Sequence, residues 1–124
     1  MNESIKNDAQ SESVQKILGA VGLAARARKC LTGTEICVDY MRAGKGKLLV
    51  IASDISDNTK KKLVKTALFH KIPYAEPRID KGSLAKAVGK KSDAAAVLII
   101  DSGFVKIIEN LNVEIHTTDT EVLL

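Results

Sequence analysis

The sequence predicts an α/β fold, specifically a three-layer α/β/α sandwich around a mixed sheet of roughly four strands. One observation is a pair of continuously apolar segments, Lys47–Ser53 and Ala94–Ile100, which are typical of central strands buried on both faces. A second is that segments with helical apolar spacing alternate with these strand-like segments. A third is the length of 124 residues, which indicates one domain that buries about two-thirds of its unfolded surface.

Caps, breakers and apolar spacing set the expected order of elements. Residues 1–12 are expected to form a disordered acidic tail, residues 13–109 the folded domain and residues 110–124 an acidic C-terminal extension. Within the domain we expect helices and strands to alternate. The first half should contain a helix capped by Ser13, a strand at Cys30–Thr32, a helix from Gly33 to Gly44 and the strand at Lys47–Ser53. The second half should contain a helix capped by Ser56 or Asp57, a strand at Tyr74–Glu76, a helix at Lys81–Val88 entered through Gly82 and Ser83, the strand at Ala94–Ile100 and a helix from Asp101 to Glu109. The extension is expected to add an edge strand around Val113–Ile115.

The formal net charge of +4 hides an uneven distribution along the chain. Residues 14–108 contain 18 lysines and arginines against 8 acids, a net charge of +10, whereas the two ends together carry −6. A domain this basic favours polyanionic partners. The alternative is a solvated lysine-rich surface that only maintains solubility, and composition is equally compatible with both.

Aromatic residues make up only 3% of the chain, and tryptophan is absent. The core is therefore expected to consist of isoleucine, leucine, valine and alanine. The same shortage argues against the aromatic stacking platforms by which RNA-recognition motifs and oligonucleotide-binding barrels hold bases.

No combination of residues predicts a catalytic centre, a metal site or a cofactor site, so the chain is not expected to be an enzyme. Cys30 and Cys37 lack zinc-site or CxxC spacing and are expected to be reduced core residues. Asp54, Asp57 and Asp101 could be read as a metal-binding or acid/base group, but two of them are well placed as helix caps or turn residues, and that interpretation is preferred. The N-terminus has no signal-peptide pattern and no apolar run reaches membrane-spanning length, which predicts a cytoplasmic protein without a membrane partner.

Polar and glycine-containing loops are expected to gather at one end of the sheet, as in open α/β folds generally. These loops are Thr32–Glu35, Ser53–Thr59, Val88–Asp93 and Asp101–Gly103. The helix that begins at Gly33 offers unpaired N–H groups to a phosphate, and the alternative is an ordinary strand-to-helix turn. The GKGK sequence of residues 44–47 follows a helix and lacks P-loop spacing, so it is interpreted as a turn with solvated lysines.

Three separated motifs resemble the superfamily of ribosomal proteins L7Ae and L30e. They are Gly33-Thr34, RAGKGKLLVIASD and SLAKAVGKKSDAAAVLIID. The sequences GLAARARKCLTG and SDNTKKKL are similar to the bacterial YlxQ-type branch, and the resemblance covers residues 14–108. It implies a three-layer α/β/α domain, and many members of the family bind kink-turn RNA, a sharply bent duplex with tandem sheared G·A pairs.

The resemblance also implies which residues would contact RNA. In RNA-binding members the second helix begins Gly-x-Asn-Glu-x-x-Lys and reads guanine edges, and a later loop, Leu-x-x-Ala-x-Gly, covers an unstacked base. Gly33 matches the first motif, and Leu84, Ala87 and Gly89 match the second. The expected RNA-binding residues are Arg28, Lys29, Gly33, Thr34, Glu35, Val88, Gly89, Lys90 and Lys91.

Within this set, four cations would contact phosphates, namely Arg28, Lys29, Lys90 and Lys91. Gly33 and Thr34 would supply backbone donors, and Val88 an apolar cover. Three positions depart from the family pattern, with Glu35 in place of Asn, Ile36 in place of Glu and Asp39 in place of Lys. Glu35 can still accept hydrogen bonds from a guanine, whereas an aspartate repels phosphate. We therefore expect lower kink-turn affinity or a somewhat different RNA target.

The preferred hypothesis is a non-catalytic protein that binds structured RNA, with ribosomal RNA, the ribosome or ribosome-associated proteins as partners and no small-molecule substrate. One alternative is a protein–protein interaction module that kept the fold and lost specific RNA binding. Another is a detached substrate-recognition domain like that of RNA methyltransferases. The acidic ends also suggest an autoinhibitory role, in which residues 1–12 and 110–124 fold onto the basic face and mimic RNA.

Overall fold

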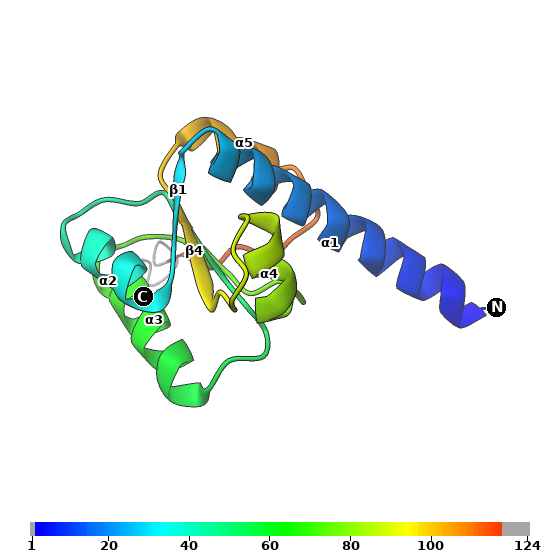
Figure 1. The fold of residues 1–124 in the computed structure, drawn as a ribbon, viewed down its shortest axis with the longest axis horizontal. Helices are drawn as coiled ribbons and strands as arrows, with labels where there is room; N and C mark the ends of the chain where they lie inside the picture. Colours follow the sequence, from blue (N-terminus) through cyan, green and yellow to red (C-terminus); the bar gives the residue numbers. More distant parts are fainter. Residues whose placement is uncertain (1, 118–124) are drawn as a thin grey trace, which may run out of the picture.

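Five helices and four strands alternate along residues 2–117, which are the residues that the computed structural model describes (Figure 1). Side chains are described from residue 12 onward. The elements are α1 (Asn2–Arg26), β1 (Cys30–Thr32), α2 (Thr34–Arg42), β2 (Leu48–Ile51), α3 (Asp57–Phe69), β3 (Tyr74–Ala75), α4 (Lys81–Ala87), β4 (Ala96–Ile99) and α5 (Ser102–Glu109). This alternation confirms the predicted α/β class.

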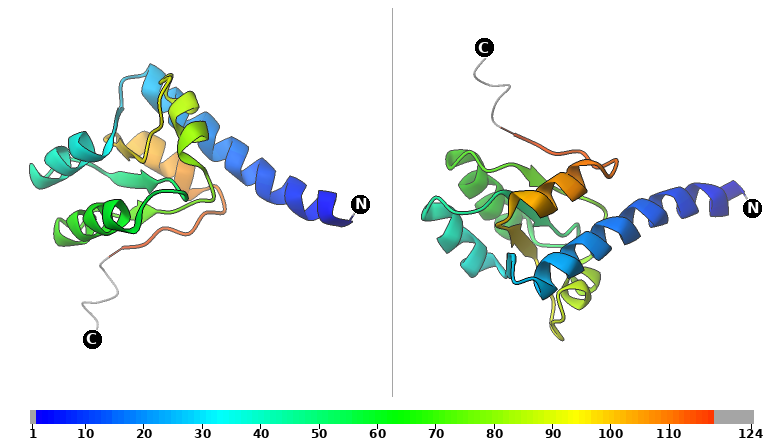
Figure 2. Two further views of the ribbon diagram at one scale, coloured as in Figure 1. Left: turned by 60° about the horizontal axis from the view of Figure 1, so that its bottom comes forward. Right: turned by 90° about the horizontal axis from the view of Figure 1, so that it is seen from above.

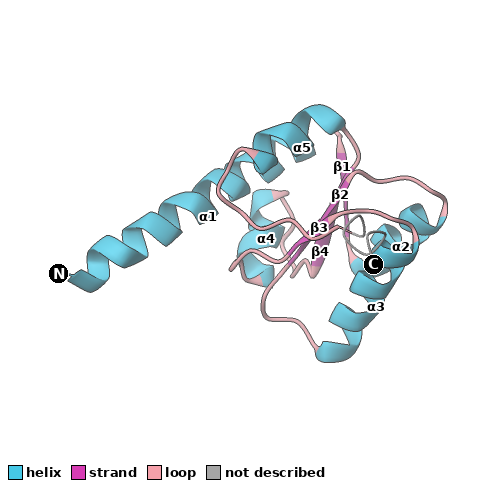
Figure 3. Cartoon of the chain, turned by 180° about the vertical axis from the view of Figure 1, so that it is seen from behind, coloured by secondary structure: helices cyan, strands magenta, loops and turns pink. Residues whose placement is uncertain are grey.

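The four strands, magenta in Figure 3, form one mixed sheet. Their order across the sheet is β1-β4-β2-β3. β4 runs antiparallel to both of its neighbours, β1 and β2, whereas β2 and β3 are parallel. Every residue of β2 and β4 is buried, which explains why their sequences are apolar without alternation. The prediction that these two strands are central is confirmed.

Helices cover both faces of the sheet, with α1, α4 and α5 on one face and α2 and α3 on the other (Figure 2). Successive residues of β2 contribute to the two cores in turn, because side chains alternate across a strand. Leu48 and Val50 pack in the core that includes α1, α4 and α5, whereas Leu49 and Ile51 pack with α2 and α3. Both cores consist of aliphatic residues, as the composition predicted, and the second also contains Cys37 and Met41.

Side-chain caps define the starts of three helices. The Ser56 hydroxyl accepts a hydrogen bond from the N–H of Thr59 at 3.2 Å, and the Asp101 carboxylate accepts from two N–H groups of the first turn of α5. Both caps were predicted. At α4 the cap is Asp80, which accepts from the N–H of Ser83 at 2.6 Å. The helix is therefore entered through a carboxylate at the N-cap position, and not through the glycine and serine that follow it.

The first helix begins earlier than the sequence predicted. α1 starts at Asn2, so Ser13 lies inside the helix and is not its cap. The N-terminal part of α1 extends beyond the rest of the domain (Figure 1). The division of the chain into an acidic tail and a basic domain stays a prediction. No helix within residues 2–117 is both long enough and apolar enough to span a bilayer.

The C-terminal extension contacts the edge of the sheet at one point only, within the described residues. His116 forms an antiparallel bridge with Tyr74, and their rings stack with centroids 4.9 Å apart. The expected edge strand around Val113–Ile115 was therefore wrong. β3 is only two residues long, which leaves little edge to pair with. Residues 118–124 lie outside the described part of the chain.

We predict that Gly46→Ala destabilises the protein more than Gly44→Ala. Both glycines have a positive φ, +119° and +78°, so each alanine carries a backbone cost of about 1–2 kcal/mol. Only at Gly46 would the new Cβ also meet a core side chain, because it would lie 2.8 Å from Cδ1 of the fully buried Leu98. Overpacking adds about 1–3 kcal/mol. Urea denaturation of the two variants measures the difference, and equal losses would contradict the steric argument.

Candidate nucleic-acid interface

Three of the four expected loops meet at one end of the sheet, which we call the Gly33 end. β1 and β2 end there and β4 begins there, because β4 is antiparallel to both. The start of α2, the β2–α3 connection and the α4–β4 connection therefore lie at the same end. The fourth loop, Asp101–Gly103, follows the last residue of β4 and so lies at the opposite end. The prediction that this loop lies beside the other three was therefore wrong.

Gly33 joins β1 directly to α2, and β4 holds its backbone. Its φ of +112° lies in the left-handed region that favours glycine. Its N–H donates to the Ala96 carbonyl at 3.1 Å, and its carbonyl accepts from the N–H of Cys37 at 2.9 Å. The sheet thus already uses the backbone donor that the sequence assigned to RNA at Gly33.

The N-terminus of α2 is open, because none of the described side chains caps it. The N–H groups of Thr34, Glu35 and Ile36 belong to the first turn and have no acceptor within the helix. The positive end of the helix dipole lies at the same place. A phosphate or another anion at this end would therefore meet the donors of these three residues, and not the N–H of Gly33.

Glu35 pairs with a lysine of the neighbouring helix. Its Oε2 lies 2.7 Å from Nζ of Lys62 on α3, and 73% of its side chain is exposed. The hydrogen bond and the charge of Lys62 hold the pKa of the Glu35 carboxyl below its ordinary value. The carboxylate still has acceptor capacity for a ligand, since an ionised carboxylate offers about four lone-pair sites. Local sequence patterns do not indicate this pair, because the two residues are 27 positions apart.

The loop after α4 is an ordered turn at the same end of the sheet. Gly89 has a φ of +79°, and the N–H of Lys90 donates to the Ala85 carbonyl at 2.9 Å. Lys90 and Lys91 are exposed. Val88 is half-buried and packs against the core below the loop.

Leu84 and Ala87, which match the family's second motif, are less exposed than Lys90 and Lys91 of the loop after α4. Leu84 is completely buried in the core between α4 and the sheet, so it supports the loop from below. Ala87 is half-buried and also packs against this core. The surface that the loop presents therefore includes Lys90, Lys91 and the exposed backbone of Gly89, followed by the exposed Ser92 and Asp93.

Arg28 and Lys29 lie at the other end of the sheet. They precede β1, and the Lys29 carbonyl accepts a hydrogen bond at 3.0 Å from Ile100, which follows β4. β1 lies between Lys29 and Gly33 and separates them by about 13 Å along the strand direction. The structure thus divides the nine predicted RNA-binding residues into a group of seven at the Gly33 end and a pair at the opposite end.

Asp54 and Cys37 make contacts that support the fold. Asp54 accepts a hydrogen bond from the N–H of Lys81 at 2.7 Å and so helps to start α4. Burial raises the pKa of the Cys37 thiol to about 12, and its sulfur donates to the Leu31 and Ala96 carbonyls. Among the described residues, no three histidine, cysteine, aspartate or glutamate side chains come close enough together to hold a metal ion.

Comparison with protein families gives a match that spans most of the chain. Residues 15–109 match the Ribosomal protein L7Ae/L30e/S12e/Gadd45 family. The chain belongs to this family. The resemblance inferred from the three sequence motifs is thereby confirmed.

The relatives define the branch more closely. The chain is similar to the RNA-binding protein YlxQ of Enterococcus faecium, with 34% identity over 92 residues that cover 74% of this chain and 86% of the relative. It is also similar to the RNA-binding protein YlxQ of Bacillus subtilis, with 32% identity over 84 residues that cover 68% and 82%. Both likenesses place it in the YlxQ-type branch of the family.

A solved structure supports the fold assignment. The Giardia lamblia 15.5kD RNA binding protein superposes with a TM-score of 0.60 over 81% of this chain and 88% of that chain. Its sequence identity is 18%, so the likeness is one of fold alone. It agrees with the mixed sheet and five helices described above.

We predict that Lys62→Gln raises the pKa of the Glu35 carboxyl toward its ordinary value. The substitution removes the hydrogen bond and the cation that stabilise the carboxylate, and the smaller effect of Arg42 remains. NMR titration of the Glu35 carboxyl carbon measures the change. Lys61→Gln, one position away on α3, is the matched control and should leave the titration as it is. An unaltered midpoint in Lys62→Gln would show that the ion pair does not form in solution.

Proposed function

We propose that this protein binds structured RNA through its Gly33 end and catalyses no reaction. The main support is the open first turn of α2, which lies at the same end as Lys90 and Lys91, in a chain related to proteins named for RNA binding. N–H groups at a helix start and nearby cations are the groups that position a nucleic-acid backbone. The proposed partner is a kink-turn-type RNA, with ribosomal RNA in the cytoplasm as its source.

The groups that would read bases differ from the family pattern. Glu35 offers acceptors to the amino and imino groups of a guanine, whereas Ile36, which is 46% exposed, offers an apolar contact only. Asp39 stands where the pattern has a lysine. Lys62 brings a cation next to Glu35 from α3, and we propose that it takes over the role of that missing lysine. The altered set favours a somewhat different RNA or a weaker kink-turn complex.

A protein–protein interaction module is the second candidate function. Its support is the exposure of large apolar side chains on α2 and α3, where Ile36 is 46% and Phe69 is 79% exposed. Phe69 also lines a groove of about 600 Å³ between these helices. Capture of partners from a nuclease-treated lysate distinguishes the two functions, because partners bound through RNA would be lost.

We predict that wild-type protein binds a kink-turn RNA more tightly than a straight duplex of equal length, and that Lys90→Gln/Lys91→Gln weakens the kink-turn complex. Each phosphate contact that is lost should lower the slope of log K against log salt concentration by about 0.9. Fluorescence anisotropy at two salt concentrations measures both effects. Equal and weak binding to the two RNAs would remove the kink-specific proposal, and no binding to either would remove RNA binding altogether.

The acidic ends give a further prediction, with truncation points that follow from the packing. Leu111, Val113 and Ile115 pack against the core, so removal of all residues from 110 onward would also destabilise the domain. Deletion of residues 1–12 and 118–124 removes acidic charge and leaves this packing in place. If the ends mimic RNA, the truncated protein binds RNA more tightly at low salt. Unchanged affinity, with unchanged thermal unfolding, would reject autoinhibition.

A further inference from the structure

The two ends of the sheet differ in charge. The connections at the Gly33 end, residues 33, 52–56, 76–80 and 88–95, contain the cations Arg78, Lys90 and Lys91 and the acids Asp54, Glu76, Asp80 and Asp93. The connections at the opposite end, residues 27–29, 43–47, 70–73 and 100–101, contain the cations Arg28, Lys29, Lys45, Lys47 and Lys71 and the acid Asp101. We call this second end the Lys47 end. Among the connections, the positive charge is therefore concentrated at the Lys47 end.

The cations of the Lys47 end have no acidic partner within the described part of the chain. The ion pairs found there are Lys60–Glu76, Lys62–Glu35 and Lys81–Asp93, and none involves this end. The acid Asp101 is engaged as the N-cap of α5. All five cationic residues are exposed. Their charges are therefore accessible to an external polyanion.

Sheet hydrogen bonds arrange these cations in a row. The N–H of Ile100 donates to the Lys29 carbonyl at 3.0 Å, and the N–H of Lys47 donates to the Ile99 carbonyl at 2.7 Å. Lys29 and Lys47 therefore flank the end of β4, about 10 Å apart, which is two strand spacings. Lys71 extends the row beyond Lys47, because β3 pairs with β2.

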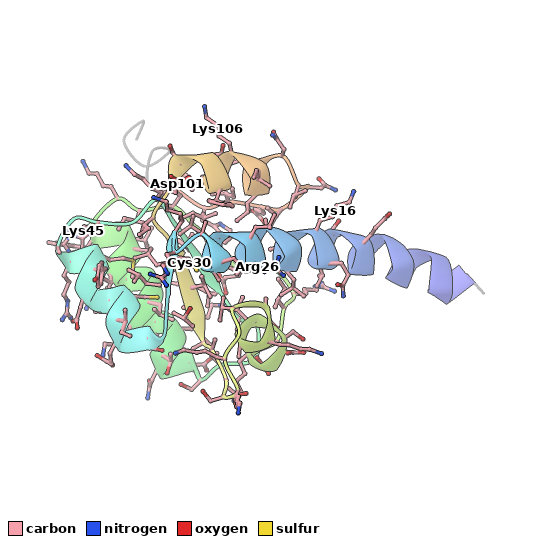
Figure 4. All side chains as sticks on the ribbon, turned by 45° about the horizontal axis from the view of Figure 1, so that its top comes forward. Lys16, Arg26, Cys30, Lys45, Asp101 and Lys106 are labelled. Atoms are coloured by element: carbon pink, nitrogen blue, oxygen red, sulfur yellow. The ribbon has the colours of Figure 1, made fainter. Side chains whose placement is uncertain are left out.

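Ordered turns present the row. Arg28 and Lys71 have φ values of +59° and +56°, and they follow the C-termini of α1 and α3. Gly46 packs directly against Leu98 of the core, which holds the turn that carries Lys45 and Lys47. Figure 4 shows Lys45 at the far end of α2, on the same side of the domain as Asp101 and Cys30. A fixed backbone lowers the conformational entropy lost on binding.

We propose that the Lys47 end is a second RNA-binding surface, which contacts the phosphates of an RNA segment distinct from the one at the Gly33 end. This inference rests on the proposed RNA-binding function. The two ends face in opposite directions along the strands, so one straight duplex does not reach both. The protein would thus hold two RNA segments, with base contacts at the Gly33 end and backbone contacts at the Lys47 end.

Three full-length variants test the proposal. Lys29→Gln/Lys45→Gln/Lys47→Gln removes charge from the Lys47 end, and Lys90→Gln/Lys91→Gln removes it from the Gly33 end. Lys16→Gln/Lys61→Gln/Lys106→Gln removes the same charge as the first variant from exposed positions outside both ends. Thermal unfolding checks that each variant is folded. A kink-turn RNA is fixed to beads, and a labelled straight duplex is then added in the presence of protein.

The wild type and the Lys16/Lys61/Lys106 variant should both carry the straight duplex onto the beads. The Lys47-end variant should still bind the kink-turn RNA on the beads, but the amount of straight duplex captured with it should fall at least tenfold. For straight-duplex binding by this variant, the slope of log K against log salt concentration should become shallower by about 0.9 for each phosphate contact removed.

Two results would overturn the second surface. One is an equal loss of straight-duplex binding in the Lys47-end variant and in its charge-matched control. The other is loss of straight-duplex binding in solution, without beads, in the Lys90/Lys91 variant alone. Failure of the wild type to bind the beads would instead overturn the proposed function at the Gly33 end. Binding of the straight duplex in solution, with loss in the Lys47-end variant only, would in that case still support the Lys47 end.

Discussion

The antiparallel ladder between β2 and β4 is the constraint on which the rest of the structure depends. Its eight residues are all buried, and alternate side chains form the cores on the two faces of the sheet. The ladder thereby requires helices on both faces. It also fixes direction, because β2 begins where β4 ends. That single relation decides at which end of the sheet each connection lies, and so which polar side chains can act together.

The sequence predicted the central strands well, because burial on both faces leaves a continuous apolar run in each of them. Helix starts were predicted correctly at the N-caps Ser56 and Asp101, whereas the N-cap of α4, Asp80, was missed. By contrast, no local sequence pattern indicates whether β4 runs parallel or antiparallel to β2. The rule that places ligand loops at the carboxyl ends of strands holds for parallel sheets. β4 is antiparallel to β2, and for that reason Asp101–Gly103 lies at the wrong end for the predicted site.

The candidate site was predictable in its backbone and less so in its side chains. A glycine before a helix requires no knowledge of tertiary structure, and Gly33 does have the positive φ that favours glycine. Its N–H group, however, is used by Ala96 of another strand, and the Glu35 carboxylate is shared with Lys62 of another helix. Contacts between residues far apart in sequence decide which donors and acceptors remain accessible. They cannot be read from spacing along one helix.

The separation of charge between the two ends has a consequence for how such a protein would distinguish RNAs. Affinity from phosphate contacts is independent of sequence, whereas base contacts discriminate. The connections at the Gly33 end hold four carboxylates against three cations, and these carboxylates would oppose nonspecific phosphate binding there. An RNA would be retained at that end only if its base edges satisfied the available acceptors and its backbone met the open turn of α2. The cation-rich Lys47 end imposes no such condition, so the same fold would combine a selective surface with an unselective one.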